Sequence, residues 1–251
     1  PFDTPAMSIH PLTHLPSIAK RLRGAGYLCV GMHGNTGHFW NRKEAYRQFG
    51  FHKFLDETYF RGQARGFNSL DHMFLKQSFS HFRKLAERGS PVFAYVISQS
   101  MHTPFVAPVT QRNKKLAASP KRLEHFYRSA NYTDAALAMF FHLMQEEGLL
   151  NNSAVIIYGD HTSGVKTGDY MCSVNDAENV PLFVVLPDSA GGIVHTYGNH
   201  TDVAPTLLDI AGVEAPGRTV GQSLLQSVPL RAYALRRGAQ DHHCRPLGPP
   251  G

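Results

Sequence analysis

The chain has 251 residues, of which 42% are hydrophobic and 18% are charged, and this composition is typical of a globular domain rather than a disordered chain. No apolar run approaches the length that a bilayer-spanning helix needs, and the net charge of +6 favours anionic partners such as phosphate or sulfate esters and acidic lipids. We expect no nucleic acid partner, because the sequence has no long Lys/Arg run with interleaved aromatic residues and no zinc-finger or helix-turn-helix signature.

The predicted elements alternate between helix and strand. Apolar residues at helical spacing predict the helices, and short runs rich in β-branched residues predict the strands. In chain order we expect a helix over 14–23, a strand over 27–32, helices over 40–48 and 69–87, a strand over 92–97, a helix over 121–147, strands over 154–158 and 180–186, and a helix that opens at 201 and runs to 210. Strands separated by helical segments indicate a mostly parallel sheet covered on both faces.

The ends of the chain differ from its middle. We expect one domain over residues 1–226 and a disordered tail over 227–251, where Arg, Gly, Pro and His dominate. The first residue is Pro1 and no signal peptide is recognisable, so we expect the chain to be a piece of something longer. The three cysteines are far apart and odd in number, and they predict neither a disulfide framework nor a Cys-x-x-Cys site.

Polar side chains gather where the predicted strands end. The carboxyl ends of parallel strands share one edge of a sheet, so residues that are distant in sequence can meet there in one cleft. The candidates in chain order are His33, Trp40, Arg42, His102, Asp160, His161 and His200.

Asp160 and His161 follow the apolar strand 154–158 directly. A carboxylate and a neutral imidazole are both good ligands for a divalent cation, and neighbours at a strand end can converge on one ion. A metal ion at this place would neutralise charge and orient a nucleophile. The structural alternative is a capped turn with a solvent-facing histidine.

The other candidates suit phosphoryl or sulfuryl transfer, in which negative charge spreads over ester oxygens. Arg42 can bind such an ester group through two parallel hydrogen bonds. His33 and His102 can donate hydrogen bonds or relay a proton near neutral pH. Trp40 offers a flat apolar wall suited to a polyol or sugar, although a single Trp is often part of the core. His200 has the alternative of capping the helix that follows.

Five segments in a fixed order resemble the lipoteichoic acid synthase and phosphoglycerol transferase branch of the sulfatase family, within the alkaline phosphatase superfamily. The first is His-Gly-Asn-Thr-Gly-His-Phe-Trp-Asn-Arg, and the match runs from about residue 13 to residue 224. Any one segment is a weak signal, but the ordered series is specific. The five segments are 33–42, 100–105, 132–135, 159–161 and 201–208.

The resemblance implies a three-layer α/β/α sandwich of the alkaline phosphatase type with a mostly parallel central sheet and its amino-terminal part missing. It implies one divalent ion bound by Asp160 and His161, Mn²⁺ or Mg²⁺, or Ca²⁺ in a sulfatase. The residues that it places at the phosphoglycerol headgroup are His33, Trp40, Arg42 and His102, with Arg42 and His102 also in catalytic roles. It places His200 where some members of the superfamily have a further histidine that contacts phosphate or metal, and we expect His200 to bind substrate, although this position varies among the relatives.

The resemblance also implies an activity, namely phosphoglycerol transfer from an anionic phospholipid headgroup to a glycan or polyol acceptor. The Thr nucleophile is expected upstream of Pro1, because Thr4 lies too close to the first helix for the family's spacing. As a separate departure from the family's pattern, Thr162 replaces a more common Gly after the Asp-His pair. We expect membrane attachment through a segment outside this chain, with the domain outside the cytoplasm. The alternatives are a sulfatase that hydrolyses sulfate esters and an inactive remnant that binds anionic glycans or headgroups.

Overall fold

The computed structural model places the chain in two compact units, residues 1–187 and 188–251, and each is described by itself. This division lies earlier in the chain than the expected boundary at residue 226. The described residues are 15–66, 68–111, 114, 122–161, 163, 165, 180–187, 189, 191–193, 198–217 and 221–226, with the backbone of 233–235 and 244–246.

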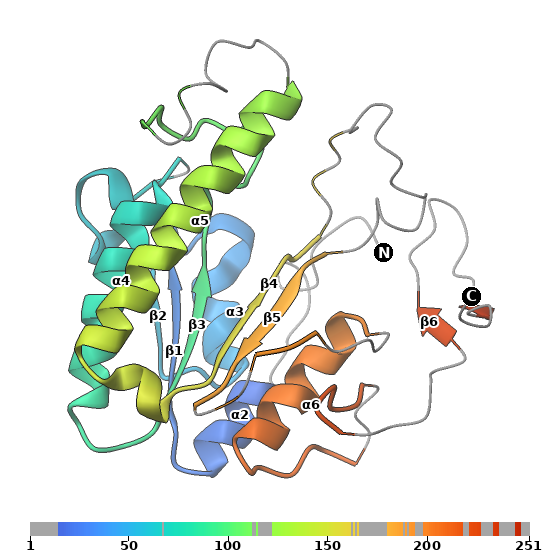
Figure 1. Cartoon of the computed structure of the whole chain (residues 1–251). Coiled ribbons are helices and arrows are strands. Elements are labelled where there is room, and N and C mark those ends of the chain that lie inside the picture. The colour runs from blue at the N-terminus through green and yellow to red at the C-terminus, as the bar shows by residue number, and fades with distance from the viewer. Residues whose placement is uncertain are drawn as a thin grey trace. The chain divides into compact units, whose positions relative to one another are not determined.

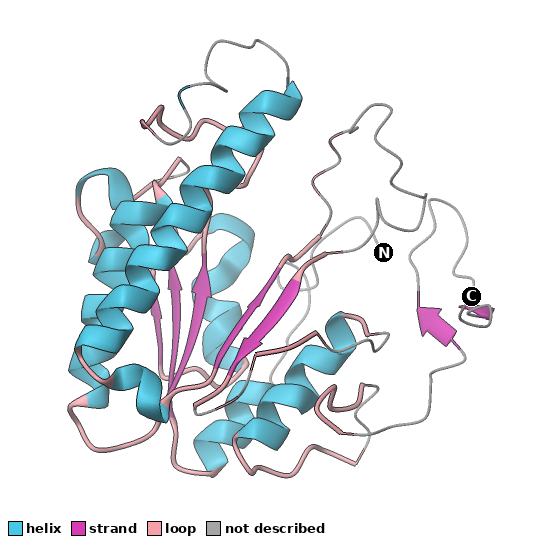
Figure 2. Cartoon of the chain, viewed as in Figure 1, coloured by secondary structure: helices cyan, strands magenta, loops and turns pink. Residues whose placement is uncertain are grey.

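A parallel sheet lies at the centre of the first unit, as Figure 2 shows. Its strand order is β2-β1-β3, formed by β1 (Leu28–His33), β2 (Lys53–Leu55) and β3 (Val92–Ile97). The predictions of β1 and β3 are confirmed, whereas β2 was not expected because three residues are too few to show a periodic pattern. β1 and β3 run side by side from the Leu28–Val92 pair to the His33–Ile97 pair, so they end at the same edge.

Helices cover both faces of this sheet. On one face α4 (Asp71–Ala86) and α5 (Arg122–Glu146) lie side by side, and α3 (Arg42–Gln48) lies on the other (Figure 1). The first helix among the described residues is α2 (Ile18–Gly24). The layers are therefore helix, sheet and helix, and the predicted three-layer α/β/α class is confirmed.

The alternation of side chains along β1 explains these layers. Val30 and Met32 point into the core cluster under α4, together with the fully buried Phe74. Gly31 faces the opposite way, where a Cβ would lie 2.7 Å from the Phe54 ring and 3.0 Å from the Tyr46 ring of α3. A glycine is needed at this position because α3 and its aromatic residues approach the strand so closely.

Two further strands of this unit pair with each other. β4 (Val155–Tyr158) and β5 (Leu182–Val185) are antiparallel, with Val155 opposite Val185 and Tyr158 opposite Leu182. Both strands were predicted, but their opposite directions were not. Neighbouring parallel strands need a crossover, usually a helix, and no helical pattern was recognised between these two, so an antiparallel pair is the simpler connection.

The second unit contains α6 (His200–Ile210), which confirms the last predicted helix. Two short strands, β6 (Tyr233–Leu235) and β7 (Cys244–Pro246), form an antiparallel pair. They lie in the segment 227–251 for which disorder was predicted, and the remainder of that segment is outside the described residues. Among the helices that the structure describes, none combines the length and the apolar character required to cross a membrane.

Candidate functional site

His33 is the last residue of β1 rather than the first residue of a loop, and it is 2% exposed. Its Nδ1 lies 2.9 Å from the carbonyl oxygen of Ile97 at the end of β3. A carbonyl only accepts, so this contact assigns the hydrogen to Nδ1 and leaves the lone pair of the neutral ring on Nε2. Burial lowers the pKa of His33 from 6.5 to about 4, against the effect of the Ile97 hydrogen bond and with a further lowering by the charge of Arg42. His33 is therefore a neutral acceptor at physiological pH.

The lowered pKa of His33 predicts how stability changes with acid. In the unfolded chain the His33 ring takes up a proton near pH 6.5, and in the folded chain only near pH 4. The contribution of His33 to the unfolding free energy is therefore complete above pH 6.5 and is lost as the pH falls towards 4. We expect His33→Gln to flatten the dependence of the unfolding free energy on pH in this window, measured by urea denaturation. His142→Gln, at an exposed histidine of α5, is the control and should leave the slope unchanged. An unaltered slope in His33→Gln would contradict the assignment.

The segment between β1 and α3 holds two consecutive non-glycine residues in the left-handed region. Trp40 has φ 53° and ψ 28°, and Asn41 has φ 54° and ψ 30°. Each such residue costs about 1–3 kcal/mol and persists only where its surroundings hold it, which is frequent at functional sites. The kink breaks the helix predicted over 40–48, so that α3 begins at Arg42. It leaves the Trp40 ring 47% exposed beside an Arg42 that is 9% exposed.

Arg42 is a buried cation with an unpaired donor. Its guanidinium carbon lies 5.2 Å from the centre of the Trp40 ring and 5.3 Å from that of Phe39, within the range of cation–π attraction. Burial lowers the pKa of the guanidinium, but an arginine keeps its charge in proteins. Nη1 has no hydrogen-bond partner in the part of the chain that the structure describes. An anion would supply both the missing acceptor and the opposite charge.

His102 lies in the turn that follows β3. Its backbone N–H donates to the carbonyl oxygen of Gln99 at 2.8 Å, and its Nδ1 lies 2.6 Å from the carbonyl oxygen of Thr103. Because β1 and β3 end together, His33 and His102 come to the same edge of the sheet, as predicted. The His102 side chain is exposed, and it lines an open, mostly polar pocket. The other residues that line this pocket are Asn68, Ser69, Leu70, Gln99, Ser100, Thr103, Val106 and Ala107.

Asp160 and His161 follow β4 and face each other. His161 Nε2 lies 3.7 Å from Asp160 Oδ2, and the His161 backbone N–H donates to Asp160 Oδ1 at 3.0 Å. Both side chains are open to solvent, at 83% and 75% exposure. The carboxylate and the imidazole fit a divalent cation as a pair. No group of three or more His, Cys, Asp or Glu side chains that could hold a metal ion occurs among the described residues.

Two half-buried tyrosines, Tyr158 and Tyr95, contact each other. The Tyr158 hydroxyl, on β4, lies 3.3 Å from the Tyr95 hydroxyl, on β3, and donates to it. Burial raises the pKa of Tyr95, the phenol of Tyr46 and the charge of Asp160 raise it further, and the charge of Arg42 lowers it. The pKa of Tyr95 thus responds to the charge of the predicted anion-binding residue and to that of the predicted metal ligand.

Sequence reasoning missed three polar residues of this region: Tyr95, Tyr158 and the fully buried Asp71 at the start of α4. Tyr95 and Tyr158 are single polar residues in the otherwise apolar strands β3 and β4, and this was the available signal for them. Asp71 lies at the start of a helix, and the sequence carries no signal of its contacts with the turn after β3.

The remaining residues that the sequence singled out are His200, Thr4 and Thr162. His200 is the first residue of α6 in the second unit, and Asn199 caps that helix by accepting from the Thr201 N–H at 2.8 Å. The capping role considered for His200 is therefore filled by Asn199, and its role in substrate binding stays a prediction. Thr4 and Thr162 lie outside the described residues.

Comparison of the sequence with known proteins gives a family. The family described as Sulfatase matches residues 3–213. Lipoteichoic acid synthase 1 of Bacillus subtilis (strain 168) is 32% identical over 218 residues, covering 80% of this chain and 33% of that protein. The lipoteichoic acid synthase of Staphylococcus aureus (strain USA300) is 28% identical over 215 residues, covering 80% of this chain and 32% of that protein. The chain thus spans about a third of the length of these curated relatives.

Comparison of the fold agrees with the sequence. The crystal structure of the lipoteichoic acid synthase LtaP from Listeria monocytogenes matches with a TM-score of 0.76 at 23% identity, covering 88% of this chain and 58% of that chain. A protein of the alkaline phosphatase superfamily from Vibrio parahaemolyticus matches with a TM-score of 0.78 at 22% identity, covering 94% of this chain and 57% of that chain. The fold is therefore alkaline phosphatase-like, and the chain belongs to the sulfatase family.

Proposed function

We propose that this chain forms the headgroup-binding part of a metal-dependent phosphoglycerol transferase. The observation that carries the proposal is Arg42, a buried guanidinium whose Nη1 has no partner in the described part of the chain, beside the exposed ring of Trp40. A cation next to a flat aromatic face suits a ligand that joins an anionic phosphate to a small polyol. The similarity to lipoteichoic acid synthases supports this class of substrate over a sulfate ester.

The other site residues take roles that follow from their surroundings. His33 is neutral and offers Nε2 as an acceptor for a glycerol hydroxyl or as a further ligand. His102 is exposed at the same sheet edge and can exchange a proton with the leaving or entering oxygen. Asp160 and His161 would hold a divalent cation, Mn²⁺ or Mg²⁺. When bound, such an ion neutralises charge on the phosphate and lowers the pKa of an attacking hydroxyl.

The reaction proceeds in two balanced steps in this proposal. A threonine hydroxyl upstream of Pro1 attacks the lipid phosphate; the Thr O–P bond forms, the bond to the diacylglycerol oxygen breaks, and that oxygen takes up the proton. A hydroxyl of a glycan or polyol acceptor, or water, then attacks phosphorus; the acceptor O–P bond forms, the Thr O–P bond breaks, and the threonine oxygen takes up the proton of the attacking hydroxyl. The lipid substrate places the enzyme at a membrane, with this domain outside the cytoplasm and its attachment in a segment beyond this chain.

The test uses the polypeptide of full natural length that carries this chain, with Mn²⁺. We expect release of diacylglycerol from phosphatidylglycerol vesicles and no hydrolysis of an aryl sulfate. Hydrolysis of the aryl sulfate alone would make the protein a sulfatase. Turnover of neither substrate, with binding of glycerol phosphate retained, would leave it a binding protein and overturn the proposal.

A further inference from the structure

Asp71 is a fully buried carboxylate at the first position of α4, and it accepts hydrogen bonds from two other elements. Its Oδ1 accepts from the backbone N–H of Gln99 at 2.8 Å and from that of Ser100 at 3.1 Å. Its Oδ2 accepts from the hydroxyl of Thr133 on α5 at 2.9 Å. In return, the Asp71 N–H donates to the Ser100 Oγ at 3.0 Å.

These bonds hold the turn that presents His102. Three hydrogen bonds fix Gln99. Its backbone N–H donates to Asp71, its side-chain oxygen accepts from the Ser69 hydroxyl at 2.8 Å, and its backbone carbonyl accepts from the His102 N–H. The turn ends at Phe105, a non-glycine residue with φ 63° whose side chain is 1% exposed. A turn that contains such a strained residue needs external contacts to fix it.

The charge of Asp71 suits this task. Burial raises the pKa of the carboxyl, and the hydrogen bonds from Gln99, Ser100 and Thr133 oppose that rise. The carboxylate also lies at the N-terminus of the sixteen-residue helix α4, where the helix dipole favours negative charge. Hydrogen bonds to an ionised acceptor are roughly twice as strong as those between neutral groups, so the ionised form holds the turn best.

We propose that Asp71 is a positioning residue, which fixes the 98–105 turn so that His102 faces the substrate. This inference rests on the proposed function, because it takes His102 to be part of the phosphoglycerol site. Asp71 itself is buried and acts only through the turn. Its removal should therefore affect turnover through His102 and through no other residue.

A double-mutant cycle tests this in the full-length polypeptide. We expect Asp71→Ala to lower kcat/KM for phosphatidylglycerol by about 10- to 100-fold, the scale seen when a supporting contact of a site residue is removed. Asp71→Asn, which keeps one acceptor oxygen, should recover part of that loss. The double variant Asp71→Ala/His102→Ala should be no slower than His102→Ala alone. Losses that multiply would show that Asp71 acts by general stability, and would overturn the proposal.

Hydrogen exchange gives a readout independent of activity. We expect Asp71→Ala to speed amide exchange in the 98–105 turn while the rest of the unit keeps its protection. Ser78→Ala is the matched control, because Ser78 is also buried on α4 but its Oγ has no partner among the described residues. Unchanged exchange in the turn overturns the inference.

Two further results separate this inference from the proposed function. If His102→Ala retains full turnover, the site assignment of His102 fails, whereas faster exchange in the turn would still show that Asp71 holds it. If Asp71→Ala does not fold, Thr133→Val replaces it, with Thr133→Ser as the control that keeps the hydroxyl donor.

Discussion

Arg42→Ala is expected to lower kcat/KM for phosphatidylglycerol by about a thousandfold, the scale on which a charged group aimed at a developing oxyanion contributes. The reason is the Nη1 of a guanidinium that is 9% exposed, a donor that has no hydrogen-bond partner among the described residues and that a bound anion would satisfy. The same argument predicts the effect on stability. A buried charge without a partner is a cost in the free protein, so the melting temperature of the variant without ligand should not fall. Steady-state kinetics and calorimetry of one preparation measure both quantities.

Arg42→Lys should recover little of the lost activity, because an ammonium group cannot make two parallel hydrogen bonds to a phosphate and does not stack on the Trp40 ring in the same way. Recovery to within a few fold would show that charge alone suffices, and would contradict the bidentate role.

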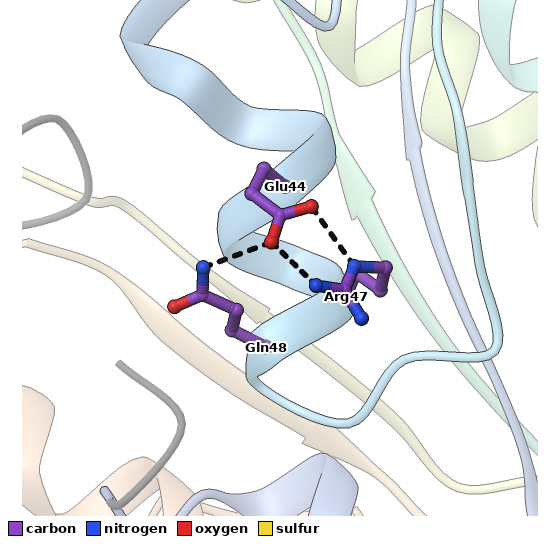
Figure 3. A network of polar contacts seen from close by, with 3 residues as sticks. All are labelled: Glu44, Arg47 and Gln48. Carbon is purple, nitrogen blue, oxygen red and sulfur yellow. Dashed lines mark hydrogen bonds and ion pairs between the residues drawn. The ribbon is translucent and has the colours of Figure 1, made fainter. Parts of the chain in front are cut away.

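Arg47→Ala is the matched control for Arg42→Ala, since both residues belong to α3. Figure 3 shows that the Arg47 guanidinium is bound by Glu44, with contacts of 2.6 and 2.9 Å, and that Gln48 donates to the same carboxylate at 2.9 Å. These hydrogen bonds lower the pKa of Glu44 to about 2. Arg47 is 70% exposed and already paired, so turnover should stay within about twofold of wild type, as exposed ion pairs contribute little. An equal loss in both variants would point to disruption of α3.

The sequence was sufficient to predict the layers and the edge where the site lies. Apolar runs such as 92–97 have the length and composition of buried strands, and the parallel strand ends bring His33 and His102 together. Local periodicity was enough for this because the core faces repeat every two residues in strands and about every 3.6 in helices.

Other features depend on contacts that no local pattern contains. The left-handed pair Trp40–Asn41 is held by its surroundings against its own preference, so a continuous helix was the natural prediction. The hydrogen bonds from the turn after β3 to Asp71 join residues that are nearly thirty positions apart. In the sequence alone, a single Asp at this position indicates no more than the start of a helix. Strand direction in the β4–β5 pair likewise depends on the connection rather than on the strands.

Asp160→Asn is expected to abolish tight Mn²⁺ binding and to lower turnover by about a thousandfold, since a metal ion supplies several kcal/mol of charge stabilisation in phosphoryl transfer. The carboxylate and the His161 ring, 3.7 Å apart, are both exposed, so neither has a structural role that would explain such a loss. Chelation of the wild-type protein should reproduce the loss, and added Mn²⁺ should restore the wild type but not the variant.

The control for Asp160→Asn is another exposed carboxylate–imidazole pair of the same unit. Glu146 Oε1 lies 3.3 Å from His142 Nε2 on α5, with both side chains more than half exposed. Glu146→Gln should leave Mn²⁺ affinity, measured by titration calorimetry, and turnover unchanged. The two pairs share chemistry and exposure but not position, because Asp160 and His161 follow β4 whereas His142 and Glu146 belong to α5. Equal Mn²⁺ affinity in wild type and Asp160→Asn would therefore remove the metal from this strand end, while a loss confined to Asp160→Asn would assign it there.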